Sequence, residues 1–334
     1  MTRRNLAPII LLTYKRLNTV TQTIEALKGC TLASESDLYI FADGAKGVKD
    51  QAQVDAVQSY LNTVKHETGF RSISLCISPV NRGISKSIID STNKIFKQSD
   101  RVIVLEDDIV VTKNFLVFMN DNLDKYKDNK TVFSISGYNY PFKTRENESL
   151  DAFFLPRSCS WGWATWKDRW VDIDWEIKSF KDFSENKSQI REFSQAGSDL
   201  FRLLNKQYKK DIDVWDVRWV YNQFQQKGIT IYPIISKVKN VGFGQDATNT
   251  NTVNRYVSKL DDGQKESFKL PENISSDEYY QRQLIQFYSI FSRIKSRLKT
   301  MFYKTISFKN PLYFFTYIFG LKYSVGIENI FSGI

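Results

Sequence analysis

Two kinds of apolar pattern alternate through the first 140 residues. Continuous apolar runs of strand length cover residues 7–12, 38–42, 73–77, 101–105 and 132–136. Between them, apolar side chains recur every three or four residues, as at Val20, Ile24 and Leu27, at Val54, Val57, Leu61 and Val64, and at Ile84, Ile88 and Ile95. The first pattern is typical of strands buried on both faces, and the second of amphipathic helices. The alternation predicts an α/β fold with a Rossmann-like, mostly parallel sheet flanked by helices.

The rest of the chain is less regular. All seven tryptophans lie between Trp161 and Trp219, a helical pattern covers residues 213–226, and a strand-like run covers residues 229–235. Apolar residues then recur at helical spacing from Leu284 to Phe302. We therefore divide the chain into an α/β half at 1–140, an aromatic-rich half of the same domain at 141–260, and a basic, aromatic C-terminal helical extension at 261–334.

The cysteine and histidine content limits which cross-links and metal sites the chain can form. Three scattered cysteines argue against a disulfide framework, and a single histidine leaves no Cys/His metal site. A metal here would need oxygen ligands, which favours Mg²⁺ or Mn²⁺. No apolar run reaches the roughly 20 residues of a spanning helix, so we expect a cytoplasmic protein.

The net charge of +10 is concentrated near the C-terminus. Residues 281–309 contain seven basic residues and no acidic one. This stretch is either a solvated surface helix or an interfacial helix on an anionic membrane, and the second interpretation suits an acceptor carried on a lipid. The basic residues are not interleaved through the fold as a nucleic-acid groove requires, so we expect no nucleic-acid partner.

The sharpest motif is the apolar run at 101–105, which ends in Glu106, Asp107 and Asp108. Ligands of parallel α/β sheets bind outside the carboxyl ends of the strands. Three adjacent carboxylates repel one another, so they favour a divalent cation, and a cation that bridges a diphosphate would neutralise the leaving group. The alternative is a solvated acidic turn that caps the next helix.

Two weaker motifs follow neighbouring strands. The run at 38–42 ends in Asp43 and Gly44, where Asp43 could accept a hydrogen bond from a nucleobase. The segment 78–86 contains Arg82 and Lys86 before a helix, which suits a phosphate. Both could equally be ordinary loops.

The order of these motifs carries a resemblance. Thr13-Tyr14-Lys15-Arg16, Asp43-Gly44, Asn81-Arg82-Gly83, Leu105-Glu106-Asp107-Asp108, Phe153-Phe154-Leu155-Pro156 and Trp161-Gly162-Trp163 follow one another along the chain. The chain resembles the inverting GT-A glycosyltransferases, and is most similar to the N-acetylglucosaminyltransferase I type and its bacterial family-2-like relatives. The resemblance covers roughly residues 7–244.

The resemblance implies a role for each motif. The first half would bind a UDP-sugar, with Thr13, Arg16, Asp43, Arg82 and Lys86 at the nucleotide and Asp43 on the uracil. In the acidic motif, Glu106 would face the donor sugar, Asp107 the ribose, and Asp108 would coordinate Mn²⁺ or Mg²⁺. Trp161, Gly162 and Trp163 would form part of the sugar and acceptor pocket, and the loop 240–250 a lid over the diphosphate.

The resemblance also implies that Asp216 is the catalytic base. Inversion needs one base on the acceptor hydroxyl, and an acid between Trp215 and Trp219 would have a raised pKa. The alternatives are an ordinary acid at a helix N-terminus, or Asp213 as the base. The match is loose, because the family element tends to carry paired acids and Val217 follows here, and the histidine that related sequences often have near Thr248 is absent.

The expected activity is transfer of a sugar, an N-acetylhexosamine or hexose, from a UDP-sugar to a hydroxyl of a glycan or lipid-linked glycan in bacterial surface polysaccharide synthesis. About half of the tryptophans should be core and the others should stack on sugars. The alternatives are a nucleotidyltransferase that acts on sugar phosphates, although a Gly-rich loop after the first strand is lacking, or a non-enzymatic membrane- or nucleic-acid-binding protein.

Overall fold

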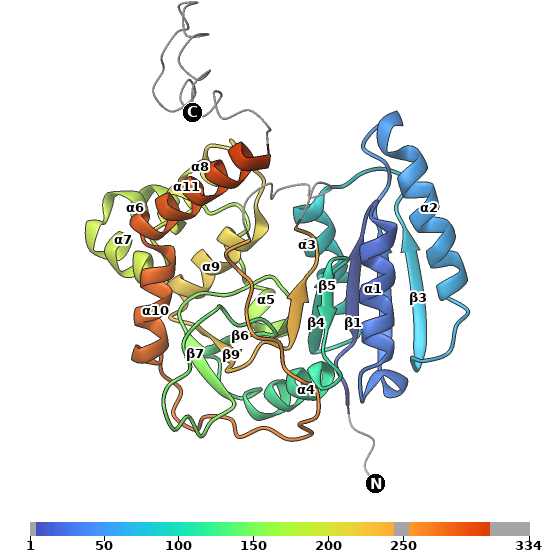
Figure 1. Cartoon of the computed structure of the whole chain (residues 1–334), viewed down its shortest axis with the longest axis horizontal. Helices are drawn as coiled ribbons and strands as arrows, with labels where there is room; N and C mark the ends of the chain where they lie inside the picture. Colours follow the sequence, from blue (N-terminus) through green and yellow to red (C-terminus); the bar gives the residue numbers. More distant parts are fainter. Residues whose placement is uncertain (1–4, 244–253, 308–334) are drawn as a thin grey trace, which may run out of the picture.

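The computed structural model describes residues 5–243 and 254–307 (Figure 1). Its centre is an eight-stranded sheet in the order β3-β2-β1-β4-β8-β6-β9-β7. These strands are β1 (Ile9–Thr13), β2 (Asp37–Ala42), β3 (Ser72–Ile77), β4 (Arg101–Glu106), β6 (Val132–Ser136), β7 (Ala152–Leu155), β8 (Trp163–Trp166) and β9 (Ile229–Pro233). A two-stranded sheet pairs β5 (Ile109–Val111) with β10 (Val238–Asn240).

Most of the large sheet is parallel, as predicted. Strands β3, β2, β1 and β4 run in one direction, and β6 and β9 are parallel to each other. Strand β8 is antiparallel to both β4 and β6, so β6 and β9 share the direction of β4, and β7 is antiparallel to β9. The predicted mixed α/β fold with a central sheet flanked by helices is confirmed, and all five predicted strands are present.

Helices cover both faces of the parallel part of the sheet. Alternate residues of β1 point to opposite faces, so Ile9 and Leu11 share one core with α1 (Leu17–Lys28) and α2 (Val48–Val64). Ile10 and Leu12 belong to a second core with α3 (Ile84–Ile95). Helix α4 (Phe115–Lys125) packs into the first core. Burial on both faces explains why these strands read as continuous apolar runs.

Aromatic side chains from the aromatic-rich half of the chain form a large core on the second face of the sheet. Five tryptophans are buried, and Trp161 and Trp175 are partly exposed. The helices of this half are α5 (Lys167–Trp170), α6 (Phe180–Glu185), α7 (Lys187–Phe193), α8 (Leu200–Tyr208) and α9 (Trp215–Gln225), and short 3-10 turns lie at Ala33–Glu35 and Ser194–Ala196. Strands from both sides of residue 140 share one sheet, because β8 lies between β4 and β6.

The C-terminal segment differs from its prediction. The periodicity predicts one helix, but the chain forms α10 (Glu278–Tyr288) and α11 (Ile290–Ser307) with a break at Ser289. Ser289 has an extended backbone, with ψ of 153°. In the described part of the chain, none of the helices combines the length and the apolar character that crossing a membrane requires.

Candidate functional site

The acidic motif lies where the parallel strands end. Glu106 is the last residue of β4 and is paired with Leu12 of β1, so Asp107 and Asp108 stand beside the segment that follows β1. From that segment, Arg16 forms ion pairs with both Asp107 and Asp108, at 2.9 Å from Nη2 to Oδ2 of Asp108. The backbone N–H of Tyr14 donates to Asp107 Oδ2 at 3.2 Å. The structure thus brings together two motifs that lie about ninety residues apart.

The three carboxylates carry more negative charge than one guanidinium balances. Burial and the charges of Asp108, Asp107 and Asp216 raise the pKa of Glu106 to about 8. Burial raises the pKa of Asp107 to about 6, although Arg16 opposes the shift. Such shifts mark a place where a ligand that brings positive charge or donor hydrogens gains free energy on binding.

A metal at this site would depend on its ligand for most of its coordination. No group of three or more His, Cys, Asp or Glu residues within 5–243 and 254–307 is arranged to hold a metal. Mg²⁺ is commonly held by one or two carboxylates and by substrate phosphates, rather than by a cage of protein groups. The oxygen donors of Asp107 and Asp108, both nearly buried, fit that mode.

The loop after β10 passes directly over these carboxylates. The backbone N–H of Val241 donates to the carbonyl oxygen of Asp108 at 2.9 Å. A Cβ on Gly242 would collide with the Asp108 carboxylate and lie 2.7 Å from Nη1 of Arg16, so only glycine allows this approach. Of the loop predicted at 240–250, residues 240–243 therefore lie at the acidic motif, and the others fall outside the described residues.

Asp216 and Asp213 lie in different environments. Asp216 is in the first turn of α9, where burial raises the pKa of its carboxyl group and the positive charge of Arg157 opposes the shift. Its charge also acts on Glu106. Asp213 lies before the helix, has a side chain that is 65% exposed and pairs with Arg218 at 3.1 Å. Of the two acids, Asp216 has the electrostatic environment that a base requires.

The sequence analysis missed a buried ion pair next to Asp216. Arg157 donates from Nη1 and Nη2 to the two carboxylate oxygens of Asp199, at 3.0 and 3.1 Å, and its guanidinium lies 3.7 Å from the ring centroid of Tyr288. The only local signal was a basic residue two positions after the apolar run 152–155, beyond Pro156. Its partner is 42 residues away, so no short-range pattern could identify the pair.

The Trp161-Gly162-Trp163 motif divides between surface and core. Trp161 is partly exposed and contacts Tyr138, Phe243 and Tyr256, with ring centroids at 4.6, 5.7 and 5.4 Å. The Gly162 backbone has φ of +60° and its carbonyl oxygen accepts from the N–H of Gly137. Trp163, predicted to line the same pocket, is 2% exposed, and its side chain packs against Trp170, Trp215 and Trp219 in the tryptophan core.

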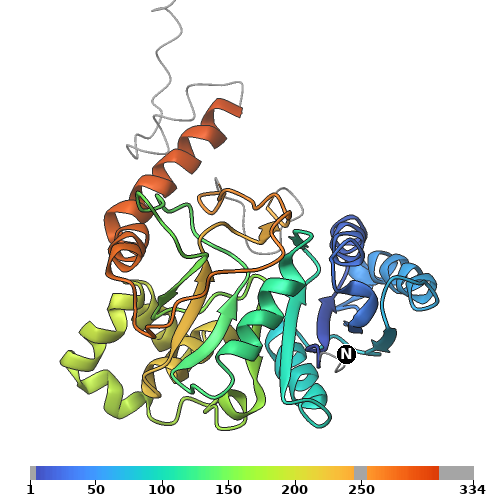
Figure 2. The same ribbon diagram turned by 90° about the horizontal axis from the view of Figure 1, so that it is seen from below.

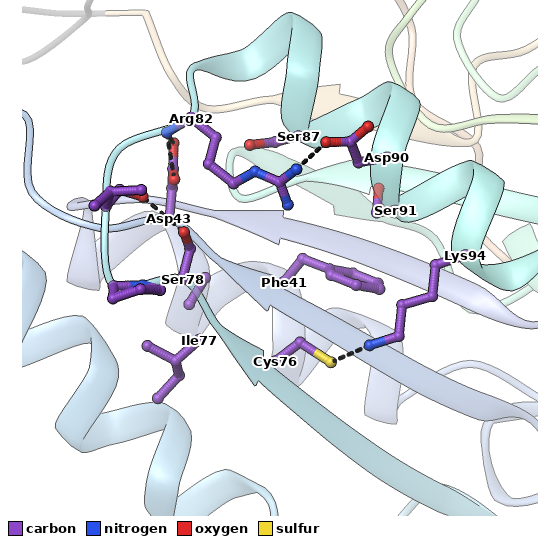
Figure 3. A pocket seen from close by; sticks show the side chains of 13 residues that line it. Phe41, Asp43, Cys76, Ile77, Ser78, Arg82, Ser87, Asp90, Ser91 and Lys94 are labelled. Carbon is purple, nitrogen blue, oxygen red and sulfur yellow. Dashed lines mark hydrogen bonds and ion pairs between the residues drawn. The ribbon is translucent and has the colours of Figure 1, made fainter.

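Asp43 ties two loops together. Its carboxylate accepts hydrogen bonds from the backbone N–H groups of Arg82, Gly83 and Gly44, between 2.8 and 3.1 Å. The loop 78–83 is thereby fixed against the end of β2 (Figure 3). Most of the acceptor capacity of the Asp43 carboxylate is therefore used inside the protein.

Beside Asp43, a cavity of about 400 Å³ lies between α3 and the edge of the sheet (Figure 3). Its lining includes Phe41, Cys76, Arg82, Asp90 and Lys94. Both Arg82 and Lys86 form ion pairs with Asp90, the latter at 3.1 Å. The predicted phosphate-binding cations are therefore partly neutralised by α3.

The predicted nucleotide-binding residues therefore form two groups. Asp43, Arg82 and Lys86 lie at the ends of β2 and β3, whereas Thr13 and Arg16 lie with the acidic motif at the ends of β1 and β4. Thr13 is 5% exposed, and its hydroxyl has no hydrogen-bond partner among the described residues. Because β1 lies between β2 and β4, the two groups share one edge of the sheet.

Comparisons with known proteins add little to this geometry. No protein-family model matches the sequence, and a comparison with curated proteins gives no match. Among solved structures, S. aureus TarS is similar at 12% identity over 47% of this chain and 28% of that one, with a TM-score of 0.33. The glycosyltransferase GlyE of Streptococcus pneumoniae TIGR4 is similar at 10% identity over 68% of this chain and 45% of that one, with a TM-score of 0.35.

A shorter form, S. aureus TarS 1–349, is similar at 10% identity over 68% of this chain and 60% of that one, with a TM-score of 0.36. The match spans less than two thirds of the length of each of these structures. Likenesses at this level carry no argument about activity, so the functional conclusion depends on the site itself.

Proposed function

We propose that this protein is an inverting, metal-dependent glycosyltransferase with a GT-A type sheet, which transfers an N-acetylhexosamine or hexose from a UDP-sugar to a hydroxyl of a glycan. The observation that carries the proposal is the arrangement at the carboxyl ends of β1 and β4. There Arg16 pairs with Asp107 and Asp108, while Glu106 responds electrostatically to Asp216 from α9. The edge is the place where parallel sheets bind ligands, and it offers both cationic and anionic groups.

The donor would lie along this edge. Asp43 would accept from the uracil, and Thr13, Arg82 and Lys86 would contact the nucleotide. Asp107 would hold the ribose, Glu106 the donor sugar, and Asp108 a Mn²⁺ or Mg²⁺ ion. When bound, the metal would supply positive charge for the diphosphate as the bond to the sugar breaks.

Arg16 makes the metal site depend on the nucleotide. Its guanidinium already pairs with Asp108, so a divalent cation would have to compete with it for that carboxylate. A diphosphate offers Arg16 a second anionic partner and offers the cation further oxygen ligands. We therefore expect UDP and the metal to bind cooperatively, each weakly in the absence of the other.

Asp216 would perform the acid–base step. Its carboxylate would take the proton of the acceptor hydroxyl while that oxygen attacks the anomeric carbon and UDP departs with the bonding electrons. One displacement inverts the configuration. The burial that raises the pKa of Asp216 increases its basicity, and the nearby charge of Arg157 favours the ionised form. Trp161 would offer its exposed ring face to the acceptor sugar.

The acceptor is a glycan or lipid-linked glycan of a bacterial surface polysaccharide in this proposal. The protein would work in the cytoplasm, on the inner face of the plasma membrane, with contact through residues 281–309.

Thermal unfolding with UDP and UDP-sugars, each with and without Mn²⁺, tests the donor site. A ligand that binds only the folded state raises Tm by an amount that grows with its affinity. We expect a Tm increase with UDP and Mn²⁺ together that exceeds the sum of the separate increases and that Asp108→Asn abolishes. Asp128→Asn, which removes an exposed acid elsewhere, is the matched control and should keep the full increase.

Two results would contradict the proposal. One is the absence of any Tm increase with nucleotides while the protein still unfolds cooperatively. The other is an increase with UDP and Mn²⁺ that Asp108→Asn leaves intact, because the metal would then be held elsewhere. The UDP-sugar that gives the largest increase identifies the donor, and release of UDP on adding a glycan acceptor measures transfer.

A further inference from the structure

Helix α11 turns its apolar side chains away from the protein. Ile290, Phe291, Ile294 and Leu298 are 63, 78, 50 and 56% exposed. In contrast, Ser292 and Ser296 are partly buried and Thr300 is buried. A surface helix of a globular protein normally has the opposite orientation, with its apolar stripe toward the core.

Helix α10, which precedes α11, has the usual orientation, with its apolar side chains toward the core. Tyr280, Leu284 and Tyr288 of α10 are buried in the main core. The break at Ser289 ends this docking, and α11 then extends away from the sheet (Figure 2). Within residues 281–307, the basic stretch is therefore divided between two helices, and of these two only α11 leaves an apolar face uncovered by the described residues.

The exposed face has a defined shape. Each residue advances about 100° around a helix, so the four apolar side chains occupy one arc of about 100°. Arg297 borders the arc on one side, and Lys295 and Lys299 border it on the other. Arg293 lies further round, where it donates to Ser198 Oγ at 3.1 Å. An apolar arc between rows of basic side chains is the pattern of a helix that lies in a membrane interface.

The charge of α11 distinguishes between the partners that could cover its exposed apolar face. No acidic residue occurs between Glu278 and Glu328 in the sequence, so nothing along the helix offsets its basic residues. A second copy of the same face would bring like charges together, which disfavours a symmetric dimer through α11. An anionic lipid surface satisfies both features, because it accepts apolar side chains and attracts the bases.

We infer that α11 docks on an anionic bilayer, with Ile290, Phe291, Ile294 and Leu298 among the acyl chains and Arg297, Lys295 and Lys299 at the headgroups. This narrows the membrane contact to one helix and names its lipid partner. It does not depend on the proposed sugar transfer, since a protein with any activity could dock in this way.

Flotation of the full chain with vesicles tests the inference. The probes are phosphatidylcholine vesicles and vesicles in which a third of the lipid is phosphatidylglycerol. We expect binding to the anionic vesicles only, and weaker binding as salt rises. Substituting Lys295 and Lys299 by serine should lower the partition coefficient roughly 30-fold, since each basic residue near the surface contributes ~1 kcal/mol.

A second variant tests the apolar arc. Phe291→Ser with Leu298→Ser should abolish vesicle binding while leaving thermal unfolding unchanged, because both side chains are exposed. Val171→Ser, which changes an apolar residue that is 57% exposed elsewhere, should bind like the parent protein. Equal binding by all variants would overturn the inference. So would sedimentation that shows a dimer in the parent protein and a monomer in the Phe291, Leu298 variant, since a second copy would then cover this face.

Discussion

Strands β2 and β4 both end in acidic residues at the same edge of the sheet, yet the two ends differ in what surrounds the carboxylates. At β2, Asp43 accepts hydrogen bonds from three backbone N–H groups. At β4, Glu106, Asp107 and Asp108 share one guanidinium, and Asp216 adds further negative charge. One end is an internal clamp for a loop, and the other is an unbalanced cluster.

The two strand ends differ in the groups that surround the carboxylates rather than in the carboxylates themselves. The backbone N–H groups at Asp43 come from Gly44 and from the loop 78–83, which is also hydrogen-bonded to the end of β2, and such groups stabilise a carboxylate without titrating. At β4, Glu106, Asp107 and Asp108 are consecutive in the sequence, and Asp216 of α9 adds a further carboxylate. The neighbours of these acids are therefore other acids. Folding supplies the partners of Asp43, whereas the partners of the β4 cluster have to come from a ligand.

Asp216→Asn tests the acidic cluster at the proposed catalytic base, where we expect the largest effect on activity. The amide cannot accept the acceptor's proton, so we expect kcat/KM for sugar transfer to fall by about a thousandfold, within the range found for loss of a general base. The Tm increase with UDP and Mn²⁺ should remain, because the donor site is intact. The measurement is the rate of UDP release with and without acceptor.

The matched control is Asp213→Asn, which removes the neighbouring exposed acid. It should keep most of the activity. If Asp213→Asn is the inactive variant and Asp216→Asn is not, then the base lies outside the cluster and the electrostatic contact with Glu106 has no catalytic meaning.

Asp43→Asn tests the clamp, and its effect should be on stability. An amide in place of the carboxylate turns one N–H donor toward the backbone N–H groups of Arg82 or Gly83, so one bond is lost and two donors face each other. We expect the free energy of unfolding to fall by ~1–3 kcal/mol, the usual range for losing hydrogen bonds to a charged group. Denaturant titration measures it.

The control for the clamp is Asp55→Asn, an exposed acid on α2 that accepts a hydrogen bond from the side chain of Gln51 at 2.7 Å. Its free energy of unfolding should stay within about 0.5 kcal/mol of the parent value. A loss of nucleotide binding in Asp43→Asn without any loss of stability would reverse our distinction, since Asp43 would then serve the ligand rather than the loop.

Local features of this fold could be predicted from the sequence, and non-local ones could not. The strands before residue 140 follow from continuous apolar runs, and the meeting of Arg16 with the acidic motif follows from the rule that parallel strands end at one edge. The position of β8 between β4 and β6 has no local signature, because its pairing partners Arg101–Val104 are about sixty residues away.

Three further features could not be predicted from the periodicity of the apolar residues. The apolar spacing runs unbroken from Leu284 to Leu298, so the break at Ser289 and the outward turn of α11 leave no trace in it. Trp161 and Trp163 look alike in sequence, and only their places relative to β8 separate surface from core. Arg157 and Asp199 meet through tertiary packing alone.

Glu106→Gln should change stability with the opposite sign to Asp43→Asn. The folded pKa of Glu106 is about 8 against an ordinary value of 4.5, so the folded protein holds the proton more tightly than the unfolded chain. For a raised carboxyl pKa, the stabilisation is complete below pH 4.5 and is lost as pH rises toward 8. Glutamine cannot ionise, so the ligand-free variant should be more stable than the parent at pH 8 and equally stable at pH 4.

We expect the Tm at pH 8 to rise by several degrees, since a pKa raised from 4.5 to about 8 corresponds to at most ~5 kcal/mol. Scanning calorimetry between pH 4 and pH 8 should show a flatter dependence of Tm on pH for Glu106→Gln than for the parent protein. Glu185→Gln, at an exposed position of α6, should reproduce the parent slope. A lower Tm for Glu106→Gln throughout this range would mean that Glu106 is stabilised inside the protein as Asp43 is, because removing an unbalanced charge cannot destabilise the ligand-free fold.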